Sequence, residues 1–169
     1  MLGVDPGSRY TGWGVIDVLG SRSQLVACGR LNVAEGEFPV RLLAIYQGLQ
    51  AVIQEHQPLE AAVEETFINR SNAQSALVLG QARGAAICAL AVAGLPVAEY
   101  AAPQVKLAIA GSGRAEKEQI QHMVKILLKT QVRLAADAAD ALAVALTHAH
   151  VRQTQQRTGT TLLRQWGRR

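Results

Sequence analysis

The chain has 169 residues, of which 49% are apolar and 4% aromatic. A chain of this length and apolar content can bury the core of one globular domain, packed mainly by aliphatic side chains and alanine. Its longest uncharged apolar stretch, residues 84–98, is shorter than the roughly 20 residues of a membrane span, so we expect a cytoplasmic protein with no membrane partner. Cys28 and Cys88 lack the spacing of a zinc site or of a disulfide framework.

The net charge of +4 at pH 7 favours a polyanionic partner, but the basic residues are unevenly distributed. Residues 152–169 hold five arginines and no acid, which leaves twelve basic and thirteen acidic side chains in residues 1–151. If four of those acids bind divalent cations, nine acids remain against twelve basic groups, and a phosphate backbone could approach. We expect one domain over residues 1–151 and a disordered Arg-rich tail over residues 152–169.

Hydrophobic periodicity and turn residues predict five strands and five helices. The strands are expected at residues 2–5, 11–18, 25–33, 61–67 and 95–100. The helices are expected between Pro39 and Pro58 and at residues 72–94, 103–109, 115–128 and 134–151. Short linkers between the first three strands favour an antiparallel meander.

Two groups of glycines suggest close packing. Gly12 and Gly14 fall on the same face of the second strand, where another backbone could approach closely. Gly80 and Gly84 stand four residues apart in a long Ala-rich helix and permit close packing against a neighbour, most simply the sheet.

Asp is scarce, with four residues in the chain, and three of these lie among Gly, Ala, Val and Leu. Asp5 ends an apolar strand before a Pro-Gly turn, a position that presents side chains to ligands but also one where Asp simply forms turns. Asp137 and Asp140 share one helix face, where two like charges favour a bound cation. An isolated pair of this kind is more often a solvated face or an interaction with the helix dipole.

Glu64 and Glu65 follow three apolar residues, so a buried strand delivers two acids that point to opposite sides. Only one can share a site with Asp5, and periodicity does not choose between them because the strand is apolar on both faces. Acids at two strand ends and a helical acidic pair, without a P-loop, GxSxG or zinc motif, indicate a two-metal nuclease site. Carboxylate oxygens suit Mg²⁺, or Mn²⁺ in its place, better than zinc.

Five motifs occur in a specific order along the chain. They are Val4-Asp5-Pro6-Gly7-Ser8 with Thr11-Gly12, Val63-Glu64-Glu65-Thr66-Phe67, Leu79-Gly80-Gln81-Ala82-Arg83-Gly84, Ala115-Glu116-Lys117, and Asp137-Ala138-Ala139-Asp140-Ala141-Leu142-Ala143. Together they resemble the bacterial RuvC Holliday-junction resolvase family, from residue 2 to about residue 150. The resemblance implies an α/β protein with an RNase H-like fold, a five-stranded mixed sheet flanked by helices, and a two-fold homodimer.

The resemblance also assigns the metal ligands. They are Asp5, Glu64, Asp137 and Asp140, a set that chooses Glu64 over Glu65. The expected cofactor is Mg²⁺, two ions in each subunit, with Asp5 bridging both. Replacing any of the four by Asn should abolish cleavage while largely sparing junction binding.

Several residues are expected to meet DNA. The resemblance implies that Phe67 lies near the branch point of the junction, and that Lys106 and Lys117 contact DNA near the scissile phosphate. Each of the three could instead be ordinary core or surface. Further plausible phosphate contacts, with a surface role equally open, are Arg70, Arg83 and Arg114, the last in a loop over residues 111–114.

The implied reaction is hydrolysis of phosphodiesters by two symmetric nicks across a four-way DNA junction. It would give ligatable ends with 5′-phosphate and cooperate with the RuvAB branch-migration complex. A non-catalytic junction-binding module is one alternative, although it would not require four convergent acids. An actin-like or sugar-kinase-type ATPase also begins with Asp-Pro-Gly and a Gly-rich hairpin, but it needs a second lobe for which 169 residues leave no room.

Overall fold

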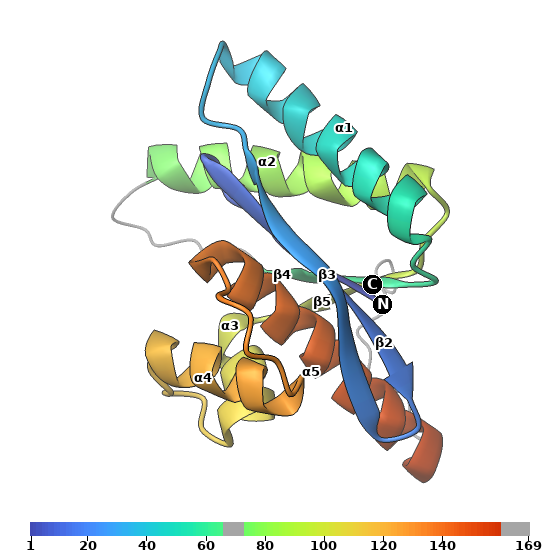
Figure 1. Cartoon of the computed structure of the whole chain (residues 1–169). Coiled ribbons are helices and arrows are strands. Elements are labelled where there is room, and N and C mark those ends of the chain that lie inside the picture. Colours follow the sequence, from blue (N-terminus) through green and yellow to red (C-terminus); the bar gives the residue numbers. More distant parts are fainter. Residues whose placement is uncertain (66–72, 160–169) are drawn as a thin grey trace.

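The computed structural model describes residues 1–65 and 73–159 (Figure 1). The elements in chain order are β1 (Leu2–Asp5), β2 (Tyr10–Leu19), β3 (Arg22–Asn32), α1 (Phe38–His56), β4 (Ala61–Glu64), α2 (Ala73–Val92), β5 (Val97–Tyr100), α3 (Ala102–Ala110), α4 (Lys117–Leu127) and α5 (Ala136–Thr158). The five strands form one sheet in the order β3-β2-β1-β4-β5. The first three are antiparallel, and β1, β4 and β5 are parallel, which confirms the predicted mixed sheet.

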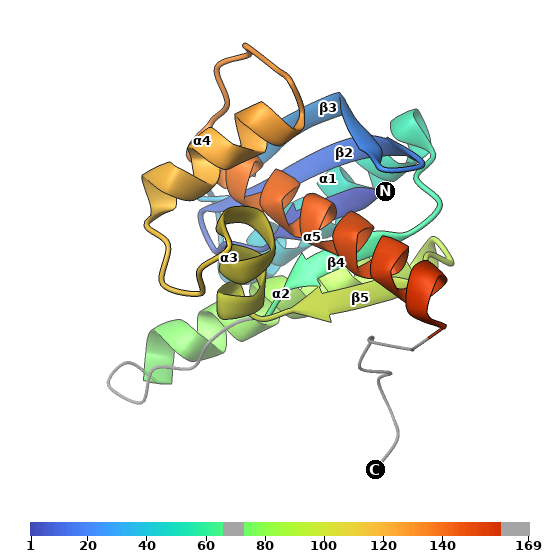
Figure 2. The ribbon, with the colours of Figure 1, turned by 90° about the horizontal axis from the view of Figure 1, so that it is seen from below.

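Helices cover both faces of this sheet (Figures 1 and 2). α1 and α2 lie on one face, and α5, with α3 and α4 beyond it, lies on the other. The alternation of side chains along β1 and β4 separates two cores. Leu2, Val4, Ala61 and Val63 pack in the α1/α2 core, whereas Ala62 packs in the core formed with α3, α4 and α5.

α5 lies directly on the backbone of β1 and β2. A Cβ atom added at Gly12 would collide with the carbonyl oxygen of Asp137, and one added at Gly14 would lie 2.5 Å from the side chain of Leu142. A Cβ atom added at Gly3 of β1 would likewise collide with the backbone of α5. The close approach predicted at Gly12 and Gly14 is confirmed, and it fixes the start of α5 over the end of β1.

α5 extends further than the sequence indicated. The helix continues through Thr158 and ends where Gly159 adopts a left-handed conformation with φ of 66°. The Nη1 atom of Arg152 donates to Glu60 at 2.5 Å, and Gln153 donates to the carbonyl oxygen of Gly20 at 2.7 Å. The predicted disorder from residue 152 is therefore wrong as far as Thr158, because these contacts hold the helix against the sheet.

Other predicted boundaries differ by a few residues. β3 begins at Arg22 instead of residue 25, and β5 begins at Val97 instead of residue 95. β4 ends at Glu64, within the predicted strand 61–67. The paired strand therefore ends at the acid that the resemblance assigns to the site.

α2 has an unusually apolar exposed face. Within the described residues it is the helix long and apolar enough to cross a membrane, yet it packs on α1 and β5, and Arg83 midway along it pairs with Glu99 of the sheet. Gly80 and Gly84 are exposed, with open space where a Cβ atom would lie. The simple expectation that these glycines pack on the sheet is wrong, and packing among the described residues does not require them.

Candidate active site

Two parallel strands bring the first pair of acids together. Val4 of β1 is in register with Val63 of β4, so Asp5 and Glu64 each follow as the last residue of a neighbouring strand. Asp5 lies on the face of Gly3, and Glu64 on the face of Ala62, so both are on the α5 side of the sheet. Glu65 follows just beyond the paired strand, and it also lines the hollow that Asp5 and Glu64 share.

The first turns of α5 supply the second pair of acids. Asp5 is in register with Gly12, and the backbone of Asp137 rests on Gly12, which places the start of α5 beside Asp5. Asp140, one turn later, lines a hollow together with Asp5 and Glu64. The four predicted carboxylates therefore converge from three segments of the chain.

Burial and mutual repulsion make Asp5 and Glu64 hard to ionise. Burial raises the pKa of Asp5 from 3.8 to about 6, and the negative charges of Asp140 and Asp137 add to this effect. The positive charge of Lys117 opposes it. Burial, followed by the charges of Asp5 and Asp140, raises the pKa of Glu64 from 4.5 to about 7. A divalent cation bound between these groups would relieve both effects.

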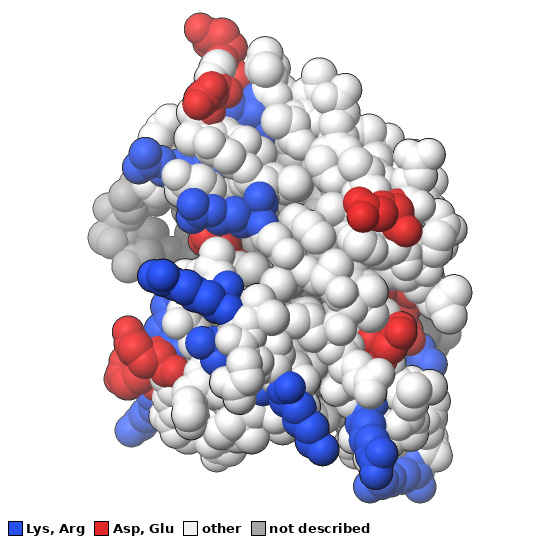
Figure 3. All heavy atoms as spheres, viewed as in Figure 1, with Lys and Arg blue, Asp and Glu red and all other residues white. Residues whose placement is uncertain are grey.

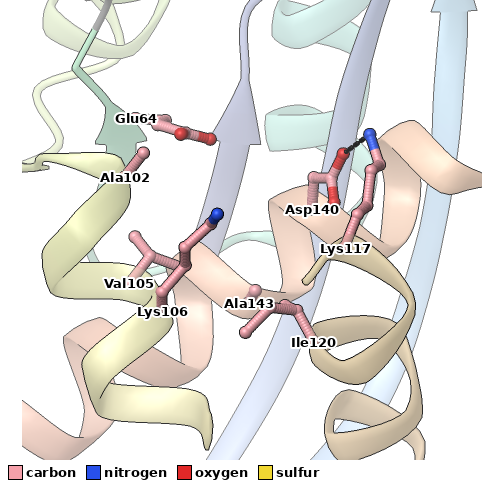
Figure 4. A pocket seen from close by; sticks show the side chains of 8 residues that line it. All are labelled: Glu64, Ala102, Val105, Lys106, Lys117, Ile120, Asp140 and Ala143. Carbon is pink, nitrogen blue, oxygen red and sulfur yellow. Dashed lines mark ion pairs between the residues drawn. The ribbon is translucent and has the colours of Figure 1, made fainter. Parts of the chain in front are cut away.

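Basic side chains border the acids. A pocket of about 230 Å³ is lined by Glu64, Asp140, Lys106 and Lys117, and both lysines point into it (Figure 4). The ammonium of Lys117 lies 2.5 Å from the carboxylate of Asp140, and this hydrogen bond raises the pKa of Lys117. In the space-filling view a small acidic area lies between groups of basic side chains (Figure 3). This juxtaposition suits a phosphate that approaches a carboxylate site.

Arg30 of β3 is a basic neighbour that the sequence analysis missed. Its guanidinium lies 3.7 Å from the carboxylate of Asp137 and stacks over the ring of Tyr10 at 4.3 Å from the ring centroid. Half of the Arg30 side chain is exposed. The register between β2 and β3 explains this position, because Arg30 pairs with Gly12 and the backbone of Asp137 packs on Gly12.

The donor set fits a hard divalent cation, but the side chains are not yet gathered as a coordination shell. In the described ranges no three acidic, His or Cys side chains lie close enough together to hold a metal ion. Asp140 is occupied by Lys117, and Asp137 by Arg30. A cation would have to compete with Lys117 and Arg30 for these two carboxylates, and oxygen ligands of this kind suit Mg²⁺ or Mn²⁺.

The remaining predicted DNA contacts lie at different distances from this site. Arg114 is exposed in the loop between α3 and α4, next to the segment that carries Lys117. Arg83 is mostly buried; its guanidinium forms an ion pair with Glu99 and donates to the carbonyl oxygen of Glu64. Phe67 and Arg70 lie outside the described residues.

Comparison with known proteins agrees with this geometry. The family model of RuvC, crossover junction endodeoxyribonuclease, matches residues 1–148. The crossover junction endodeoxyribonuclease RuvC of Xanthomonas campestris pv. campestris (strain B100) is 50% identical over 171 residues, which cover 100% of this chain and 98% of that protein.

Solved structures show the same likeness. The RuvC of Thermus thermophilus in complex with a Holliday junction substrate superposes with a TM-score of 0.83 and 35% identity, covering 90% of this chain and 94% of that one. The yeast mitochondrial Holliday junction resolvase Ydc2 shares the fold at a TM-score of 0.68 and 10% identity, covering 92% and 81% of the two chains.

Proposed function

The chain belongs to the RuvC family of crossover junction endodeoxyribonucleases, and from this premise we propose that its four converging carboxylates cut DNA strands at four-way junctions in recombination and repair. The observation that carries the proposal is the placement of Asp5 and Glu64 on the α5 face of the sheet, beside Asp137 and Asp140. The match to RuvC over residues 1–148 supports a nuclease rather than an ATPase.

We assign the four carboxylates to the binding of two Mg²⁺ ions, with Mn²⁺ as a substitute. When bound, such ions stabilise the attacking and leaving oxygens of an in-line displacement at phosphorus. Asp5 and Glu64 would hold them from the sheet, and Asp137 and Asp140 from α5. Because Asp5 stands between Glu64 and the start of α5, we assign it the bridging position.

The basic residues around the site would orient the DNA. Lys106 and Lys117 line the pocket with Glu64 and Asp140, so their ammonium groups can neutralise a phosphate that enters it. In this scheme the ammonium group of Lys117 leaves the carboxylate of Asp140 and binds the phosphate instead. We assign Arg114 to a neighbouring phosphate of the same strand, and the resemblance to RuvC supports Phe67 at the branch point and Arg70 as a phosphate contact.

A homodimer supplies the second cut. A junction offers two symmetry-related strands, so paired nicks require two sites related by a two-fold axis. The exposed face of α2 fits a second copy of this chain, because Leu77 is 59% exposed and Gly80 and Gly84 leave room for a close backbone. On family resemblance we further propose that the dimer works in the cytoplasm with the RuvAB branch-migration complex.

The dimer is tested by the mass of the protein in solution. We expect wild type to be a dimer in light scattering and Gly84→Trp to be a monomer. Gln119→Trp, a change of similar size on the exposed side of α4, should leave the dimer intact. A Gly84→Trp variant that remains dimeric would rule out α2 as the contact.

The activity is tested with a synthetic four-way junction and Mg²⁺, beside a linear duplex. Wild type should make paired symmetric nicks with 5′-phosphate ends, and Asp5→Asn should bind the junction without cutting it. Asp17→Asn is the matched control, because this exposed acid of β2 does not line the hollow, and it should keep cleavage. If wild type binds the junction but does not cut it with either Mg²⁺ or Mn²⁺, the chain is a junction-binding module.

A further inference from the structure

Arg83 is a basic residue on α2 whose side chain turns towards the sheet. Its Nη2 atom forms a close ion pair with the carboxylate of Glu99 on β5, and its Nε donates to the carbonyl oxygen of Glu64 at 3.2 Å. Only 18% of the Arg83 side chain and 14% of the Glu99 side chain are exposed. One guanidinium therefore joins α2 to the ends of two parallel strands.

The ion pair lies on the opposite side of the sheet from the carboxylate site. Val97 packs in the α1/α2 core, so Glu99, two residues later on β5, points to that same side. Glu64 shares its pocket with Asp140 of α5, on the other side of the sheet (Figure 4). A phosphate that enters the pocket beside Lys106 and Lys117 would meet the other face of the strand (Figures 1 and 4).

The bond to Glu64 lies at the end of β4, where the strand is paired on one side only. The pairing of β4 with β1 ends at Val63, one residue before Glu64. On the other side, the amide of Glu65 donates to the carbonyl oxygen of Tyr100 at 2.8 Å. Glu64 is the last residue of β4. The Arg83 donor supplies a hydrogen-bond partner to the backbone of a residue that must aim its carboxylate accurately.

We propose that Arg83 is a positioning residue, which fixes the backbone of Glu64 and thereby the carboxylate of Glu64 in the nuclease site. The proposal rests on the proposed function, and it replaces the expectation that Arg83 contacts a phosphate. The ion pair with Glu99 holds the guanidinium in place, because the planar fork can serve a carboxylate and a carbonyl together. Arg83 directly precedes Gly84, which lies on the face of α2 that we assign to the dimer contact. Arg83 therefore also links the dimer contact to Glu64, a proposed metal ligand.

The two roles of Arg83 differ in what its loss would change. A phosphate contact contributes to affinity, and its removal weakens binding of the junction and reduces the salt slope of log K by about 1. A positioning residue contributes to the geometry of Glu64 after the junction has bound. Its removal lowers the nicking rate at saturating junction and weakens the response to divalent cations, while affinity stays the same.

The experiment compares Arg83→Gln with Arg114→Gln, the exposed arginine of the α3–α4 loop. Junction affinity is measured without divalent cation at several salt concentrations, and single-turnover nicking is measured across a Mg²⁺ series. We expect Arg83→Gln to lower the saturated nicking rate at least tenfold and to leave affinity within about twofold and the salt slope unchanged. Arg114→Gln should show the reverse pattern.

A second readout does not depend on activity. Mn²⁺ should raise the melting temperature of the wild-type dimer, because cations bind the folded carboxylates. Arg83→Gln should show a smaller rise at the same Mn²⁺ concentration, because Glu64 is no longer held in place. Arg83→Lys keeps the charge beside Glu99 but lacks the fork, so we expect an intermediate nicking rate.

Loss of Arg83 leaves Glu99 buried without a partner, which could unfold the chain. The double variant Arg83→Gln/Glu99→Gln removes both charges and keeps an amide pair. We expect it to fold as a dimer and still to nick slowly, because the donor to the Glu64 carbonyl is misplaced. A double variant that nicks at the wild-type rate overturns the proposal, as does a loss of affinity with a reduced salt slope in Arg83→Gln. Absence of nicking by wild type on the same junction would instead refute the proposed function.

Discussion

Asp5→Asn should stabilise the metal-free protein at neutral and alkaline pH even though it abolishes cleavage. Asp5 is buried beside other acids, and its pKa is raised from 3.8 to about 6. At pH 8 the folded protein must hold the ionised carboxylate in a place where the neutral form is favoured. Asn has nearly the same shape and no charge, so it removes this cost.

The size of the effect follows from the pKa shift. Two pKa units correspond to about 3 kcal/mol at ~1.4 kcal/mol per unit. A domain of this size gains roughly 2–4 °C in melting temperature per kcal/mol, so the upper value is a gain of about 6–12 °C. Because the folded pKa lies above the unfolded one, the contribution of Asp5 to the stability of wild type is greatest below pH 3.8 and is lost as the pH rises through about 6. The gain of the variant should therefore be absent near pH 4 and complete by pH 8.

The assay is thermal unfolding of wild type and Asp5→Asn between pH 4 and 8 in EDTA, with Asp17→Asn on β2 as a control for the loss of one negative charge. Added Mg²⁺ should stabilise wild type and narrow the difference from Asp5→Asn. If Asp5→Asn is less stable than wild type at pH 8 without metal, the carboxylate serves the fold through its own contacts, and the argument from burial and repulsion fails.

Three further substitutions test separate parts of the structure. Gly12→Ala should lower the free energy of unfolding by about 1–3 kcal/mol in chemical denaturation, because its Cβ atom would displace the backbone of α5, whereas Gly113→Ala, which meets only an ordinary contact at 3.5 Å, should cost far less. Tyr100→Phe removes the 2.8 Å hydrogen bond between its hydroxyl and Nδ1 of His148 and should cost about 1–3 kcal/mol in the same assay, with nicking unchanged. Lys117→Gln should weaken junction binding and reduce the salt slope by about 1; an unchanged slope would remove Lys117 from the DNA contacts.

Local patterns single out Asp5, Asp137 and Asp140 as candidates, but the interpretation as metal ligands came from the combination of acids and from the resemblance to RuvC. A strand that ends in Asp before a turn, and two acids three apart on a helix, are features of short range. The choice between Glu64 and Glu65 is different, because both flank the same apolar strand. It follows from the pairing of Val63 with Val4, which sets the face that Glu64 shares with Asp5, and this register is a property of the whole sheet.

The cationic neighbours of the site could not be derived from local patterns. Arg30 reaches Asp137 only because β3 pairs with β2 in the register that places Arg30 opposite Gly12. Arg83 is one of several arginines in the sequence, and its burial against Glu99 depends on how α2 crosses β5. The end of α5 at Thr158 likewise depends on contacts with the sheet, of which the Arg152 bond to Glu60 is one.

The distribution of charge across the four acids explains how one site can accept both cations and a polyanion. Asp137 and Asp140, on the helix, each have a basic partner in Arg30 and Lys117, which are half or more exposed. Asp5 and Glu64, on the sheet, are deeper, and their pKa values are raised first by burial and then by the negative charge of neighbouring acids. Cations that bind the sheet acids would compete with Lys117 and Arg30 for the helix acids and turn these two basic side chains outward. The same event that fills the site then presents positive charge to the phosphate of the junction, so binding of metal and binding of the scissile strand should reinforce each other.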